Sequence, residues 1–137
     1  MKPGLRWTTG FATVTLHSFT GDTLRLYYEP APGAPHMTGG RDLSALIAAL
    51  PDLRRHRCDN GRHRDFLSEA RDTEMAHLLE HAIIEVLASD GQTPRSQIRG
   101  ATNLDEAPAR YRIKISGFRC ATEAGECIEK ALRLLES

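Results

Sequence analysis

Two histidines and a glutamate stand at a spacing that could hold and use a metal ion. They are His77, Glu80 and His81, in the order H-x-x-E-H, and Glu85 follows four residues after His81. Histidines four positions apart project from the same side of a helix, so both imidazoles can reach one ion. A carboxylate between them can reach a water that the ion holds. This order is that of the inverted zinc-peptidase motif.

The chemistry that such a site would perform is the hydrolysis of an amide. Zn²⁺ held by His77, His81 and one further ligand keeps an open position, where bound water becomes acidic enough to attack near neutral pH. Glu80 would be the catalytic base that takes the proton of that water and passes it to the leaving amine. The third ligand is open at this point, and the candidates are Glu85, His56, Cys58 and Glu106.

A strongly periodic helix over residues 73–88 carries these side chains. At about 100° per residue, the four polar residues of the motif fall on the side opposite the apolar stripe. An ordinary solvated helix face has the same pattern, with surface pairs worth a few tenths of a kcal/mol. Ile84 and Ala88 interrupt the polar side, which indicates the wall of a cleft.

The remaining elements predict an α+β two-layer sandwich. Its sheet of about four strands would be mostly antiparallel, with the helices packed on one face. Two apolar-polar alternations flank the turn residues Thr20, Gly21 and Asp22, and the last helix would bury Cys120 and Cys127. The sequence predicts strands at 11–18, 23–29, 96–101 and 111–115, and helices at 42–50, 64–70, 73–88 and 119–135.

Composition limits the partners. The 137 residues suit one domain, residues 1–137, and its 18 basic and 18 acidic side chains give no global attraction to nucleic acid or to an anionic membrane. We therefore expect neither as a partner. No apolar run approaches transmembrane length and no signal peptide is recognisable, so we expect a cytoplasmic protein. Three irregularly spaced cysteines argue against a disulfide framework.

Basic residues gather in two places. Residues 54–64 hold five arginines and two histidines, and a solvated loop is the simpler interpretation because aromatic residues do not interleave with them. Arg99, Arg110 and Arg112 lie on or near a predicted strand, on its outer face. The candidates for substrate binding are His56, Cys58 and Arg99.

A longer pattern of spaced residues surrounds the helix motif. It resembles the N-terminal domain of cyanophycin synthetase, and the resemblance spans nearly the whole chain. The residues that carry it are Leu50, Pro51, Leu53, His56, Cys58, Gly61, Phe66, Thr73, His77, Glu80, His81 and Glu85.

The resemblance implies an α+β domain that helps to hold a β-aspartyl-arginine polymer. In some members this domain is similar to a zinc metallopeptidase that trims the polymer, which implies His77, His81 and Glu85 as the zinc ligands and Glu80 as the base. The expected partner is then a peptide or an Asp/Arg-rich polymer, with a homo-oligomer or a partner protein as a further expectation. The alternative is a non-catalytic binding or accessory domain with vestigial histidines. The ATP-grasp and Mur-ligase-like domains of the synthetase have no counterpart in these residues.

Overall fold

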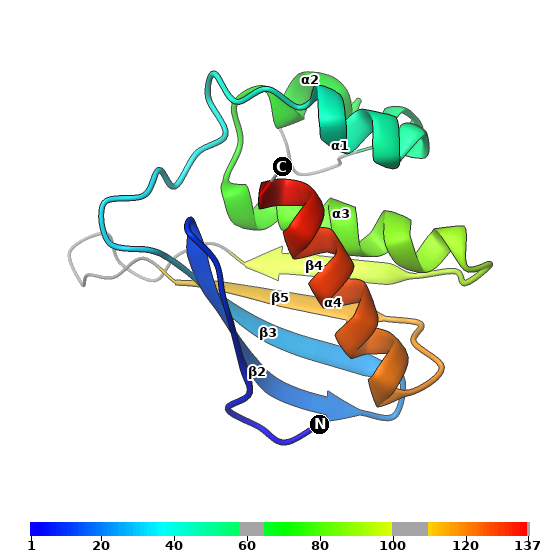
Figure 1. The fold of residues 1–137 in the computed structure, drawn as a ribbon. Coiled ribbons are helices and arrows are strands. Elements are labelled where there is room, and N and C mark those ends of the chain that lie inside the picture. The colour runs from blue at the N-terminus through cyan, green and yellow to red at the C-terminus, as the bar shows by residue number, and fades with distance from the viewer. Residues whose placement is uncertain (58–64, 100–109, 137) are drawn as a thin grey trace.

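The computed structural model describes residues 1–57, 65–99 and 110–136. They form an antiparallel sheet whose helices all lie on one side of it (Figure 1), which confirms the predicted α+β class. The strands, in the spatial order β1-β2-β3-β5-β4, are β1 (Arg6–Thr8), β2 (Ala12–Thr20), β3 (Thr23–Pro30), β4 (Arg95–Arg99) and β5 (Tyr111–Ser116). The helices are α1 (Ser44–Ala49), the 3-10 helix η1 (Pro51–Arg55), α2 (Phe66–Ala70), α3 (Met75–Ser89) and α4 (Ala121–Glu136).

The sheet has five described strands, where the sequence predicted about four. The additional strand, β1, has three residues, which is too short for a visible alternation, and it pairs with β2 through Trp7 and Val14. The predicted hairpin is present as β2 and β3, and Gly21 takes the left-handed conformation at its turn with a φ of 63°. The predicted strand at 96–101 is β4, which ends at Arg99, and residues 100–101 lie outside the described residues.

Alternation decides which side chains meet the helices. On β2, β3 and β5 the apolar positions are buried under the helices and the polar positions point to the other face. A bulge between Leu16 and Ser18 adds one residue to β2, and His17 is exposed there. The sheet therefore has one face that is covered by helices and one that no described helix covers (Figure 1).

Helix α3 lies between two layers. The sheet packs against one side of it through β4 and β5, and η1 and α2 lie over the side away from the sheet (Figure 1). Almost every side chain of α3 is buried as a result, including the polar ones. The interpretation of the polar side as an ordinary solvated helix face was therefore wrong, because the segment before α3 folds back over it. The expectation of a cleft wall at Ile84 and Ala88, which are half-buried, stays a prediction.

Two smaller expectations also fail. Cys120 is exposed and precedes the first residue of α4, whereas Cys127 is buried in the core as predicted. The predicted helix at 42–50 is shortened to α1, because Pro51 begins the separate helix η1. None of the described helices is long and apolar enough to cross a membrane.

Candidate metal centre

The polar side chains of α3 form a buried cluster. The exposed fraction is 8% for His77, 4% for Glu80, 7% for His81 and 6% for Glu85. Burying a group that can be charged is costly unless another group compensates it. Each of these four side chains therefore needs a partner inside the protein or a bound ion.

His77 and His81 face each other through the nitrogens that could bind a metal. Their Nε2 atoms are 3.2 Å apart, and their ring planes meet at 71°. Two nitrogens on one tetrahedral Zn²⁺ at about 2.0–2.1 Å each lie about 3.3 Å apart. The separation in the protein already matches that of two ligands on one ion.

The other nitrogen of His77 is held by a hydroxyl group. Thr73 Oγ1 lies 2.9 Å from His77 Nδ1, and Thr73 donates its hydroxyl proton to Glu74 Oε2 at 3.1 Å. Since that proton is committed, His77 Nδ1–H must be the donor to Thr73. Burial lowers the pKa of His77 below its ordinary value, so the ring is neutral at neutral pH and its Nε2 carries a lone pair.

His81 is oriented by a second chain of hydrogen bonds. His56 Nε2 lies 2.5 Å from Glu85 Oε2, and His56 Nδ1 lies 2.9 Å from His81 Nδ1. In the tautomer in which His56 donates Nε2–H to Glu85 Oε2, its Nδ1 accepts, and His81 Nδ1–H is the donor there. Burial, with His77 and His56 nearby, lowers the pKa of His81 to about 3. His81 is then neutral, with its Nε2 lone pair aimed towards His77.

Phe66 fixes the His81 ring from one side. Its ring stacks on that of His81 at 3.8 Å between centroids and 16° between planes, and it meets the His77 ring edge-on at 5.5 Å. Phe66 begins α2, where Asp65 caps the helix by accepting from Ser68 N–H. The aromatic ring holds the imidazole plane and keeps water from that side of the cluster.

Glu80 completes the group. Its Oε1 atom lies 3.8 Å from Nε2 of each histidine, and one ligand atom from each of the three residues lies within 4.8 Å of the others. Burial raises the pKa of Glu80 to about 7, and a hydrogen bond with Ser96 opposes this shift. A carboxyl group with this pKa can both accept and release a proton near neutral pH.

The sequence as a whole places the chain in a family. The model of one family, the cyanophycin synthase-like N-terminal domain, matches residues 42–137. The chain belongs to this family. The match includes the whole of α3 and the residues that orient its histidines. No curated protein and no solved structure matches the chain.

Within this cyanophycin synthase-like domain, the predicted site residues fall into two groups. His77, Glu80 and His81 come together, which places the predicted base and two predicted ligands in one cluster. Glu85 and His56 contact each other instead, and His56 connects them to His81. The assignment of Glu85 as a zinc ligand stays a prediction, and its described contact is that with His56.

Of the other predicted residues, the structure describes Arg99, and it does not join the cluster. Arg99 is exposed at the end of β4, where its neighbour Ile98 takes the position towards the helices. Cys58 and Glu106 lie outside the described residues. Sequence reasoning missed the contributions of Phe66, Thr73 and Ser96. Phe66 and Thr73 did carry a signal, since both belong to the pattern of spaced residues that resembles the family, whereas Ser96 carried none.

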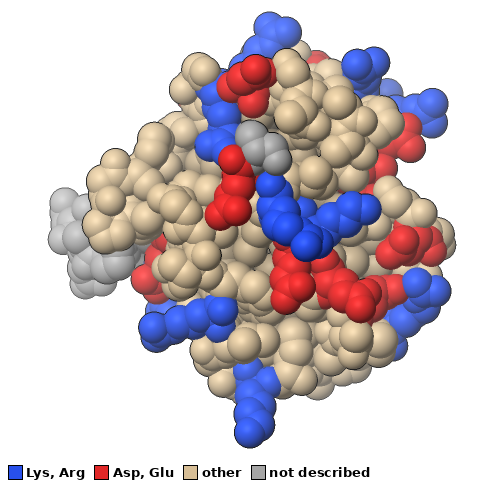
Figure 2. Space-filling model, viewed as in Figure 1, with Lys and Arg blue, Asp and Glu red and all other residues tan. Residues whose placement is uncertain are grey.

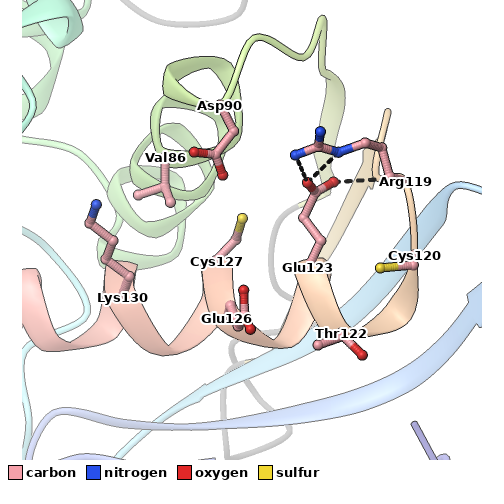
Figure 3. Close-up of a pocket in the computed structure, with 9 residues that line it drawn as sticks. All are labelled: Val86, Asp90, Arg119, Cys120, Thr122, Glu123, Glu126, Cys127 and Lys130. Atoms are coloured by element: carbon pink, nitrogen blue, oxygen red, sulfur yellow. Dashed lines mark hydrogen bonds and ion pairs between the residues drawn. The ribbon is translucent and has the colours of Figure 1, made fainter.

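A hollow elsewhere on the surface is separate from this centre. It lies between the end of α3 and the start of α4 (Figure 3), where Arg119 and Glu123 hold each other through Arg119 Nε and Glu123 Oε2 at 2.7 Å. The Cys127 thiol also lines it, and burial raises the pKa of this thiol to about 11, so it is protonated and unreactive. No residue of the histidine cluster lines this hollow.

Proposed function

We propose that the chain is a zinc-dependent hydrolase that acts on a polyamide or isopeptide such as a β-aspartyl-arginine polymer. The observation that carries the proposal is the 3.2 Å separation of His77 Nε2 and His81 Nε2, with each opposite ring nitrogen held by a hydrogen bond. Metal-binding histidines are commonly fixed in this way, by a partner on the nitrogen that does not bind the metal. Membership of the family supports the choice of polymer.

The residues suit zinc because both imidazoles are neutral and both Nε2 lone pairs face one point. Zinc bound there would supply an acidified water and would polarise a carbonyl oxygen. Glu80 would hold the proton taken from water and hand it to the leaving amine, since its carboxylate stands 3.8 Å from both nitrogens. His56 and Glu85 would keep His81 in the tautomer that offers Nε2 to the metal.

The burial of the cluster favours a second candidate function. All three clustered side chains are less than one-tenth exposed, as is usual where a metal serves the fold alone. In that case the domain would be a non-catalytic binding or accessory domain, and Glu80 would be the third ligand. The two candidates differ in what the loss of the Glu80 carboxylate does.

Metal analysis and cleavage of the polymer test the proposal together. Protein purified without chelator should carry about one zinc per chain, and His77→Ala and His81→Ala should lose it. His17→Ala is the matched control, because His17 is exposed on the sheet and lies outside the cluster. Glu80→Gln should keep zinc and lose cleavage of β-aspartyl-arginine polymer.

Each alternative result has a definite meaning. Protein that takes up no zinc even when it is supplied in excess refutes both candidates that use a metal. Zinc lost in Glu80→Gln makes this residue a ligand and favours the non-catalytic domain. Zinc that is abolished, rather than weakened, in Glu85→Gln assigns Glu85 as the third ligand.

A further inference from the structure

The uncovered face of the sheet is strongly basic. Alternation along the strands places six cations on the side away from the helices, and we call this surface the basic face. The cations are Arg6, Arg25, Arg95, Arg99, Arg112 and Lys114. We propose that the basic face binds a single-stranded nucleic acid.

Strand pairing concentrates these charges. Arg99 is the cross-strand partner of Arg112, and Lys114 lies between Arg25 and Gln97 on the two neighbouring strands. Cross-strand partners lie about 4.5–5.5 Å apart, so like charges directly opposite each other destabilise the sheet. A bound polyanion would remove that repulsion, because it places negative charge between the guanidinium groups.

Carboxylates are scarce on this surface. Among the described strand residues that point away from the helices, the one acidic side chain is Glu29, and it is already paired with Arg110 at 3.1 Å. The whole chain has a formal net charge of zero, so the charge of the basic face is balanced elsewhere. On the side seen in Figure 2, basic and acidic side chains lie next to one another.

The uncharged side chains of the basic face favour a nucleic acid over a protein partner or a membrane. At the outward positions of the described strands they are threonine, serine, glutamine, histidine and tyrosine, with no aliphatic residue among them. Protein interfaces usually have an apolar centre, and stable membrane attachment needs an apolar insertion or a lipid as well as charge. Phosphate binding needs neither, because it depends on cations and on small hydrogen-bonding groups.

Two aromatic rings lie on the same surface. The bulge in β2 brings His17 against Tyr27, with ring centroids 5.0 Å apart, and the Arg110 guanidinium lies 3.9 Å from the centre of the Tyr27 ring. Unpaired bases stack on aromatic rings and on guanidinium planes, and a sheet with helices on its other face is a common platform for this. An acidic polypeptide of aspartate and glutamate has no planar bases to stack on these rings. The aromatic group therefore selects a single strand among polyanions.

The overall composition does not reveal the positive charge of the basic face. We expected no nucleic acid because basic and acidic residues are equal in number, but that equality averages over two sides of the molecule. The basic face also lies on the opposite side of the sheet from the histidine cluster. The two proposals are independent, and Glu80→Gln is expected to bind nucleic acid as the wild-type chain does.

Fluorescence anisotropy with labelled oligouridylate and oligothymidylate of about 20 nucleotides tests the proposal. With about five phosphates neutralised, the slope of log affinity against log salt should be about −3 to −4. Affinity should then fall roughly 100-fold between about 50 and 200 mM salt. The double variant Arg99→Glu/Arg112→Glu should weaken binding at least about tenfold at the lower salt concentration.

The matched control is Arg54→Glu/Lys130→Glu, which changes the net charge equally at exposed positions of η1 and α4. Nearly unchanged binding in this control supports the proposal, provided that circular dichroism shows both variants folded. Equal weakening by the two double variants overturns it, since binding then follows net charge alone. The absence of binding at about 50 mM salt overturns it as well. Tighter binding of poly-glutamate or of phosphatidylserine vesicles than of either oligonucleotide also overturns it.

Discussion

Replacing Glu80 by glutamine should make the free energy of unfolding more dependent on pH, because Glu80 offsets the titration of the buried histidines in the wild-type protein. In the metal-free protein, the buried histidines and the buried glutamate respond to pH in opposite directions. Glu80→Gln removes one of the two responses and changes few contacts, because glutamine has nearly the same shape. The free energy of unfolding of the variant should then fall more steeply with decreasing pH than the wild-type value does.

The buried histidines make the fold less stable as the pH falls. The pKa of His81 falls from 6.5 to about 3 in the folded protein, so below pH 6.5 the unfolded chain takes up a proton that the folded chain refuses. The contribution of His81 is complete above pH 6.5 and is lost as the pH falls towards about 3. At about 1.4 kcal/mol per pH unit, about 2 kcal/mol is lost by pH 5. The lowered pKa of His77 acts in the same direction.

Glu80 acts in the opposite sense. Its pKa rises from 4.5 to about 7, so the folded protein holds a proton that the unfolded chain releases. Its contribution is complete below pH 4.5 and is lost as the pH rises through 7. Lowering the pH from about 7 to about 5 therefore restores about 2 kcal/mol, nearly the amount that His81 removes. Over this interval the wild-type stability should therefore fall only by the contribution of His77.

Urea unfolding in the presence of EDTA measures the difference. Trp7 packs against the core and is the one tryptophan of the chain, so its fluorescence reports the transition. Between about pH 7 and pH 5, Glu80→Gln should lose about 2 kcal/mol more than the wild-type protein loses. Glu126→Gln, at an exposed position of α4, is the control and should follow the wild type. Equal losses of stability in the variant and in the wild-type protein would refute the opposed titrations.

Five further changes test the surroundings of the cluster and the fold. His56→Ala should weaken zinc binding about 10- to 100-fold without abolishing it, because the residue orients His81, and competition with a chromophoric chelator measures this. Phe66→Ala should cost about 3–5 kcal/mol in urea unfolding, since the ring is fully buried against the imidazoles. Thr38→Val should cost about 1–3 kcal/mol in the same assay, because its hydroxyl bonds two buried backbone groups. Gly117→Ala should lower the melting temperature, since its φ is +113° and an added Cβ would meet backbone atoms at 3.1 Å, whereas Gly125→Ala in α4 should raise it.

The sequence was informative wherever a pattern is local. Helix α3 follows from its periodic apolar residues, and the shared side of His77 and His81 follows from their spacing of four. The hairpin follows from two alternations around Gly21. Each of these depends on residues within one or two turns, where helix and strand geometry leave little choice.

The rest depended on contacts between distant segments. His56 reaches His81 across 25 positions, and Phe66 reaches it from another helix, so no spacing could predict either contact. The burial of the polar side of α3 has the same origin, because η1 and α2 return over it. The basic face likewise needed the order of the strands, since Arg99 and Arg112 become neighbours only through the pairing of β4 with β5.

The burial of the cluster raises the question of why polar side chains, rather than apolar ones, occupy this part of the interior. Apolar residues of similar size would pack in the same place without the cost of desolvating three imidazoles and two carboxylates. A ligand that binds only the folded chain reverses this comparison. At a concentration of about a thousand times its dissociation constant, such a ligand adds about 4 kcal/mol to stability. Zinc held by His77 and His81 would have this effect, whereas the same residues without a metal would only weaken the fold that buries them.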